Sequence, residues 1–217
     1  METVRVYYRK TGRGKYISHL DITRCMKRAL RRAGIPVWYT EGFNPHAYMT
    51  FALPISLGFE SLCETMDIRL TDPMPFDEIQ NRLNRALPEG LTITKVGKPV
   101  KTANEIAYSR YVLTARLDGC TGPASCFEQF LAQPQILVEK RTKRGTKEVD
   151  LRPDITVKGL REENETLILE VILPSGNEKT VNPTLLLASF AEYAKCPLCF
   201  HSVSRTAVYT ADFTLFE

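Results

Sequence analysis

A helix near the N-terminus is bounded by its own sequence at both ends. Ser18 is a favoured N-cap residue, and Asp21 three positions later makes an imperfect capping box. Gly34 suits the C′ position that ends a helix, and Pro36 prevents the helix from continuing. Between these limits an apolar stripe at helical spacing is formed by Ile22, Met26, Ala29, Leu30 and Ala33. The segment therefore predicts an amphipathic helix that ends near Ala33.

The outer side of this predicted helix is strongly basic. Residues 5–32 contain ten lysines and arginines but one acidic residue, Asp21, whereas the 217-residue chain has a formal net charge of only +4. The outward face carries Arg24, Arg28 and Arg31 at i, i+4 and i+7, and Lys27 and Arg32 flank them. A local field of this kind attracts polyanions and is weakened by salt. We expect this face to bind the phosphates of nucleic acid, with a solvated cationic surface as the alternative.

The predicted elements repeat in the two halves of the chain. In the first half we predict a helix from the Ser18 cap to about Ala33, another at residues 75–86, and strands at 4–8, 37–40, 47–52, 64–70 and 91–96. In the second half we predict helices at residues 124–131 and 183–194, strands at 108–117, 136–142, 167–173 and 202–210, and a further candidate strand at 155–160. Reduced to its core, each half has the order β-α-β-β-α-β of the ferredoxin-like fold. We therefore predict an α+β protein of two tandem ferredoxin-like (βαββαβ) units, residues 1–99 and 105–217, joined near residues 97–104.

The segment after the first helix carries an aromatic, an amide and a histidine between turn-forming residues. In Gly42-Phe43-Asn44-Pro45-His46, the glycine permits a tight turn and the proline restrains Asn44 to extended geometry. Phe43 is a candidate stacking platform for a base, Asn44 a candidate reader of a base edge, and His46 a further RNA contact. The alternative for Phe43 is a core residue that plugs the space beneath the loop.

His19 and His46 are candidate catalytic residues. His19 lies in the first turn of the helix, where the positive end of the macrodipole disfavours imidazolium and favours a neutral ring that can act as a base. Together with Asp21, Glu41 and Glu64, the histidines could support general acid–base chemistry or bind a metal. A packing or capping role is the alternative for His19. Because the spacing supports neither chemistry strongly, we assign no metal and no cofactor.

A second basic segment lies in the other half of the chain, at residues 140–147. It interleaves cations with threonine and glycine, is expected at a hairpin tip or loop, and precedes Arg152. Its cations are Lys140, Arg141, Lys143, Arg144 and Lys147. Such residues suit phosphate contact, with a solvated loop as the alternative. Before the first helix, Gly12-Arg13-Gly14-Lys15 adds Lys15 as a candidate phosphate contact, although a simple polar turn fits that segment equally well.

We expect neither secretion nor membrane insertion. The first ten residues lack the apolar core of a signal peptide, and no apolar run approaches about 18 residues. Six scattered cysteines are typical of reduced thiols. Cys196-Pro-Leu-Cys199 is expected to hold packed thiols rather than a redox or zinc pair. The chain is therefore predicted to be cytoplasmic and to have no membrane partner.

Long motifs run through the chain: GKYISHLD, RALRRAGIP, YTEGFNPH and FALP in the first half, and RTKRGTKEVDLRP in the second. These motifs resemble those of a bacterial family, the radical SAM-linked proteins, over most of the chain. One departure is Ala47, where the family commonly has proline after N-P-H. Members occur beside or fused to a radical SAM protein, and their genes tend to lie near ribosome and ribonuclease genes. The resemblance therefore implies a radical SAM protein as partner and RNA as target. This chain has no C-x-x-x-C-x-x-C motif, so it is not expected to hold the radical SAM cluster itself.

These patterns predict an RNA-binding accessory protein that acts with a radical SAM enzyme on structured RNA, either tRNA or rRNA. Two alternatives stay open. One is a metal-independent endoribonuclease that uses His19 and His46 as base and acid. Its fold-level likeness to the CRISPR-repeat-processing endoribonucleases is an analogy and carries little about function. The other alternative is a protein-only adaptor of a radical SAM enzyme.

Overall fold

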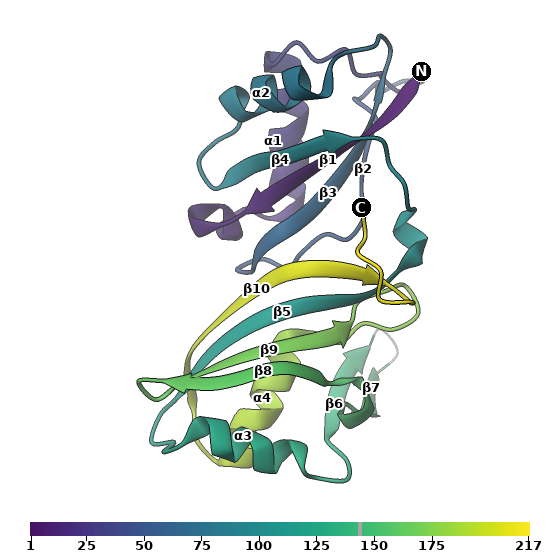
Figure 1. Cartoon of the computed structure of the whole chain (residues 1–217). Helices are drawn as coiled ribbons and strands as arrows, with labels where there is room; N and C mark the ends of the chain where they lie inside the picture. The colour runs from purple at the N-terminus through teal and green to yellow at the C-terminus, as the bar shows by residue number, and fades with distance from the viewer. Residues whose placement is uncertain (143–144) are drawn as a thin grey trace. The chain divides into compact units, whose positions relative to one another are not determined.

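The computed structural model describes residues 1–142 and 145–217 (Figure 1). The chain divides into two compact units. Unit 1 comprises Met1–Glu105 with Phe216–Glu217, and unit 2 comprises Ile106–Leu215. Within the described ranges the chain forms four α-helices, two in each unit, and its strands pair antiparallel. The protein is therefore α+β.

Unit 1 contains the basic helix, α1. Its elements are β1 (Glu2–Lys10), a 3₁₀ turn (Gly12–Tyr16), α1 (His19–Arg32), β2 (Met49–Phe51), β3 (Glu60–Leu70), α2 (Phe76–Ala86) and β4 (Leu91–Gly97). The strands of unit 1 lie side by side in the order β4-β1-β3-β2, and every neighbouring pair is antiparallel. The connection from β1 to β2 contains α1, the connection from β3 to β4 contains α2, and all four strands belong to one sheet.

Both helices of unit 1 pack on the same face of its sheet (Figure 1). Alternation along β1 sends Val4, Val6 and Tyr8 into the core, where they join side chains of both helices, including Ile22 and Ile79. The residues between them on β1 therefore belong to the opposite face of the sheet. The apolar stripe predicted for α1 is confirmed, since Ile22, Met26, Ala29 and Leu30 are buried.

The strand predicted at residues 37–40 is wrong. Val37 makes an isolated bridge to Leu70, and Tyr39 makes one to Ala47. Because Val37 and Tyr39 bridge to two different segments, residues 37–39 form no ladder with either. The strand predicted at residues 47–52 is shorter than expected and spans Met49–Phe51, which pairs with residues 66–68 of β3.

Unit 2 has the same core order with one insertion. Its elements are β5 (Ile106–Leu117), α3 (Pro123–Leu131), β6 (Leu137–Thr142), β7 (Gly145–Asp150), β8 (Thr156–Glu163), β9 (Thr166–Pro174), α4 (Pro183–Ala194) and β10 (Leu198–Thr210). Its sheet has the order β10-β5-β9-β8, all antiparallel. Phe127, Phe130 and Phe190 cluster under this sheet, with ring centroids 4.9–5.6 Å apart.

The segment at residues 136–142 does not enter the main sheet of unit 2 as predicted. It forms β6, which pairs only with β7 in a separate two-stranded sheet. The candidate strand at residues 155–160 takes the place beside β9 as β8. The physical reason is composition, because β7 is polar and its residues 145–148 are exposed, so this hairpin has little apolar surface to bury.

The longest helix in the described part of the chain is α1, with 14 residues. No helix there is both long enough and apolar enough to cross a membrane.

Candidate nucleic-acid interface

The start of α1 is fixed by the predicted cap. The Ser18 hydroxyl oxygen accepts a hydrogen bond from the Asp21 backbone N–H at 3.2 Å, and the hydroxyl donates to the Asp21 carboxylate at 2.7 Å. Arg24 Nη1 donates to the other carboxylate oxygen at 3.1 Å. Hydrogen bonds from Ser18 and then Arg24 lower the pKa of the Asp21 carboxyl. Asp21 therefore serves both as a capping partner and as the counter-charge of one arginine.

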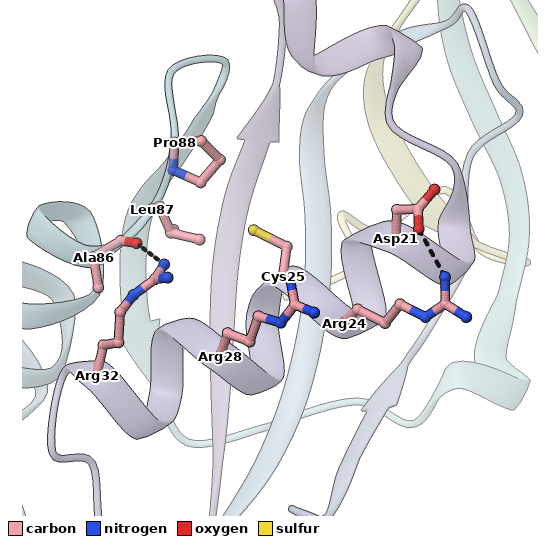
Figure 2. Close-up of a pocket in the computed structure, with 8 residues that line it drawn as sticks. All are labelled: Asp21, Arg24, Cys25, Arg28, Arg32, Ala86, Leu87 and Pro88. Carbon is pink, nitrogen blue, oxygen red and sulfur yellow. Dashed lines mark hydrogen bonds and ion pairs between the residues drawn. The ribbon is translucent and has the colours of Figure 1, made fainter.

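Three arginines of α1 line one side of a surface hollow of about 480 Å³ (Figure 2). Arg24, Arg28 and Arg32 follow one another at intervals of four residues, about 6 Å along the helix axis. The facing wall is formed by Ala86, the last residue of α2, and by Leu87 and Pro88 of the turn that leads to β4. The helix therefore presents a row of guanidinium groups to an open depression rather than to a flat surface.

The arginines of this hollow differ in how they are held. Arg24 is paired with Asp21, and Arg32 Nη2 donates to the Ala86 carbonyl at 2.6 Å (Figure 2). Arg28 is exposed between them and has no ion pair with any described carboxylate. The guanidinium of Arg28 is therefore the one in the row that remains available to an anion.

The hollow selects a different set of arginines from the one that helical spacing suggested. Arg31 is exposed on α1 but does not line the hollow, whereas Arg32 does. The reason is tertiary, since the α2–β4 turn packs on the Arg32 side of the helix. Lys27, which was expected to flank the row, is half-buried and also lies outside the lining.

Cys25 is a lining residue that the sequence analysis did not identify. It lies between the arginines in the wall of the hollow. Burial raises the pKa of the Cys25 thiol, and the charges of Arg32 and Arg28 partly offset that rise. A single cysteine without a motif carries no sequence signal for such a position.

The loop at residues 40–46 is closed by hydrogen bonds at its base. The Thr40 backbone N–H donates to the His46 carbonyl at 2.9 Å, and the His46 N–H donates to the Thr40 hydroxyl at 3.2 Å. His46 Nδ1 lies 3.1 Å from the Asn44 carbonyl oxygen. The Thr40 hydroxyl oxygen lies equally close to Nδ1, at 3.1 Å, and a hydroxyl can either donate or accept, so both contacts hold the ring in the loop. The loop is thus built by Thr40, Asn44 and His46.

Phe43 lies at the exposed part of this loop. Its relative exposure is 105%, so the alternative in which it plugs the core is wrong. Below the loop, Arg69 of β3 lies 4.5 Å from the ring centroid of Tyr48 and 5.1 Å from that of Trp38. The Arg69 carbonyl also accepts the Trp38 N–H at 2.7 Å. The fully exposed Phe43 ring therefore lies on a loop whose flanking residues Trp38 and Tyr48 are held by contacts with Arg69.

The two histidines have separate surroundings. The His19 ring makes an edge-on contact with Phe51, with centroids 5.0 Å apart, while His46 is engaged within its own loop. The Asp21 carboxylate accepts hydrogen bonds from Ser18 and Arg24. Within residues 1–142 and 145–217, no three His, Cys, Asp or Glu side chains are grouped so that they could hold a metal. A catalytic role for either histidine stays a prediction.

The other predicted phosphate contacts lie on short local structures. The Gly12-Arg13-Gly14-Lys15 segment belongs to the 3₁₀ turn, and Lys15 Nζ lies 5.3 Å from the Tyr16 ring centroid. In the second basic segment, Lys140 and Arg141 lie in β6, and exposed Lys147 lies in β7 opposite Lys140. Lys143 and Arg144 lie outside the described residues. Arg152 begins a 3₁₀ turn and is half-buried.

Comparison with solved structures shows the type of fold. A chain in a crystal structure titled "Crystal Structure of a Cbf5-Nop10-Gar1 Complex" superposes with a TM-score of 0.53 and 9% sequence identity. The match covers 94% of this chain and 48% of that chain, so this chain spans about half the length of that relative. At such low identity the likeness concerns the fold alone.

Comparison by sequence places the chain in a family. The comparison with curated proteins found no match. The model of a family described as "Uncharacterized protein conserved in bacteria (DUF2344)" matches residues 3–183, which is most of the chain. The chain belongs to the DUF2344 family of bacterial proteins.

Proposed function

We propose that unit 1 binds structured RNA, either tRNA or rRNA, through the arginine row of α1. The observation that carries this proposal is the hollow in which Arg24, Arg28 and Arg32 converge with Asp21 as the carboxylate in its lining. A guanidinium is planar, stays protonated at working pH and matches the geometry of phosphate oxygens. A hollow beside such a row lets a phosphate approach the uncommitted guanidinium of Arg28 with Arg24 and Arg32 on either side of it.

The arrangement of charge on α1 supports binding rather than stability. Like charges at i, i+4 destabilise an isolated helix by about 0.2–0.5 kcal/mol per pair. In the part of the chain that the structure describes, only Arg24 of this row pairs with a carboxylate. A row that opposes helix formation is readily explained by an anionic ligand that compensates the repulsion.

The loop at residues 40–46 supplies the candidate base contacts. Phe43 offers an exposed ring on which an unpaired base can stack, and Asn44 and His46 offer polar groups beside it. Lys15, Lys147 and Arg152, with the remaining cations of residues 140–147, would extend the phosphate contacts. This division assigns affinity to the arginines and recognition of single bases to the loop.

We also propose that each unit is a ferredoxin-like domain and that the protein acts with a radical SAM enzyme. The strand orders β4-β1-β3-β2 and β10-β5-β9-β8, each with two helical connections, support the fold assignment. The two compact units also support a division of the chain near residues 99–105. The proposal of a radical SAM enzyme as partner rests on the sequence motifs that resemble those of the radical SAM-linked proteins.

Filter binding of total tRNA and rRNA in low salt tests the RNA proposal. We expect Arg28→Glu to lose at least about tenfold in affinity and to show a shallower salt dependence. Arg9→Glu is the matched control, because exposed Arg9 makes the same charge reversal on β1 of the same unit. Absence of RNA binding by the wild-type protein, or equal losses in the control, would contradict the proposal.

A second candidate is a metal-independent endoribonuclease. It is favoured by the contacts of His46 Nδ1 with Thr40 and the Asn44 carbonyl, which hold the ring while Nε2 makes no hydrogen bond to a described residue. Incubation of the protein with RNA and a chelator tests it, because cleavage should persist in chelator and disappear in His19→Ala or His46→Ala. A protein-only adaptor is instead indicated if a radical SAM protein co-purifies after nuclease treatment while RNA binding is absent.

A further inference from the structure

A second hollow adjoins the first at the end of the two helices of unit 1. It has a volume of about 550 Å³ and is lined by Arg32, Ala33, Arg82, Arg85 and Ala86. Arg32 and Ala86 line both hollows, and the 2.6 Å hydrogen bond from Arg32 to the Ala86 carbonyl lies at the boundary. The arginine surface of α1 therefore continues onto the C-terminal turn of α2.

The cations of the second hollow have distinct roles. Arg82 is engaged twice, since it pairs with Glu78 on its own helix and donates to the Ala33 carbonyl at 3.3 Å. Arg85 is exposed in the last turn of α2, and among the described residues it has neither a carboxylate nor a hydrogen-bond partner. Arg82 therefore ties the end of α1 to α2, whereas Arg85 points its charge at solvent.

Each hollow thus combines the shared Arg32 with one uncommitted guanidinium. In the first hollow this is Arg28, and in the second it is Arg85. Both helices are packed into one core through residues such as Met26 and Leu83, so the separation of the two hollows is fixed by the fold. A ligand that occupies both hollows therefore needs two anionic groups, such as two phosphates.

We propose that the two hollows bind successive phosphates of one nucleic-acid backbone that crosses from α1 to the end of α2. The inference rests on the proposed RNA-binding function and adds Arg85 as a contact of its own. The ligand class is then a phosphodiester chain rather than an isolated phosphate or mononucleotide, because the second contact becomes intramolecular once the first is made. Arg32 lies between the two phosphates and contributes to both positions.

A purely structural role for Arg85 predicts something different. A cation in the last turn of a helix interacts favourably with the macrodipole, so neutralising it would lower the stability of α2 without changing RNA affinity. Thermal unfolding and RNA affinity, measured on the same variants, therefore separate the two roles.

The test compares Arg85→Gln, Arg28→Gln and the double variant with Arg9→Gln as control. RNA affinity is measured at several salt concentrations, with inorganic phosphate and a mononucleotide as short probes. We expect each site variant to lose about fivefold to tenfold in RNA affinity and to reduce the slope of log K against log salt by about one. The double variant should lose the product of the two, and the short probes should bind weakly to the wild-type protein.

The outcomes separate this inference from the RNA proposal on which it rests. If Arg28→Gln weakens RNA binding but Arg85→Gln behaves like Arg9→Gln, the second phosphate position is wrong and the RNA proposal stands. If both site variants behave like the control, both are wrong. An acidic peptide that binds as tightly as RNA, with the same dependence on Arg85, would overturn the assignment of the ligand as a phosphodiester.

Discussion

Arg5 and Asp67 form a two-point ion pair across β1 and β3 of unit 1. Arg5 Nε lies 2.7 Å from Asp67 Oδ1, and Nη2 lies 2.8 Å from Oδ2. The two residues are direct partners in the strand register, and the Phe216 ring lies 4.6 Å from the guanidinium. The side chain of Arg5 is only 2% exposed, and its Nη1 also donates to the Glu217 main-chain oxygen at 3.3 Å, so Asp67 is the side-chain carboxylate that pairs with a buried charge.

Replacement of that carboxylate should destabilise unit 1. In Asp67→Asn the buried guanidinium loses its counter-charge, and we expect a loss of about 3 kcal/mol in the free energy of unfolding. Urea denaturation followed by circular dichroism measures it. The control is Glu2→Gln, which removes the exposed pair with Lys98 in the same unit and should change stability by less than about 1 kcal/mol. Equal effects in the two variants would contradict the expectation.

The parts of the fold that could be predicted are those marked by local chemistry. Ser18 and Gly34 bracket α1, and Pro183 at the first position of α4 fixes a helix that ends at Ala194 as expected. The choice of sheet partners was not predictable in the same way. Residues 136–142 and 155–160 both suit a strand, and only tertiary packing places the second beside β9 and leaves the first in a separate hairpin.

The candidate site likewise has features that follow from one helix and features that depend on tertiary packing. Helical spacing alone predicts that Arg24 and Arg28 share an outward face, because that depends on one helix. The lining of the hollows by Arg32 and Arg85 depends on how α2 and the turn after it pack on α1. The sequence places Arg85 in the last turn of a predicted helix, but it does not show that this turn packs beside the end of α1.

Gly14 should tolerate no side chain. A Cβ at this position would lie 2.4 Å from the Gly90 carbonyl oxygen, because the 3₁₀ turn packs directly on the turn before β4. We expect Gly14→Ala to destabilise unit 1 by about 1–3 kcal/mol through backbone displacement. Gly97→Ala is the matched control, since a Cβ there has no neighbour within 4 Å. Thermal unfolding of the two variants tests this, and similar midpoints would show that the turn can shift freely.

Phe43 should matter for RNA and not for folding. Its ring is fully exposed, so Phe43→Ala removes no packing and should leave the unfolding midpoint unchanged. If a base stacks on this ring, the same variant should lose about tenfold in affinity for RNA with unpaired bases and much less for duplex RNA. Phe200→Ala, at a half-exposed aromatic of unit 2 outside the proposed site, is the control. Unchanged RNA affinity in Phe43→Ala would remove the loop from the interface.

The cysteines of unit 2 should differ sharply in reactivity. Burial, and then the nearby thiols of Cys126 and Cys196, raise the pKa of Cys120 to about 11. Cys199 is exposed, and its thiol donates to the Arg116 carbonyl at 3.1 Å. The thiolate is the reactive form, so at pH 8 iodoacetamide should alkylate Cys199 well before Cys120.

Raising the pH from 8 to 10 sharpens this test. Because Cys120 stays below its pKa over that interval, its thiolate fraction and its alkylation rate should rise about tenfold per pH unit, provided that the fold is intact. Mass spectrometry of peptides from timed reactions measures the two rates, with circular dichroism as the check on folding. Rapid alkylation of Cys120 in the folded protein at pH 8 would mean that its thiol is neither buried nor held near the other two.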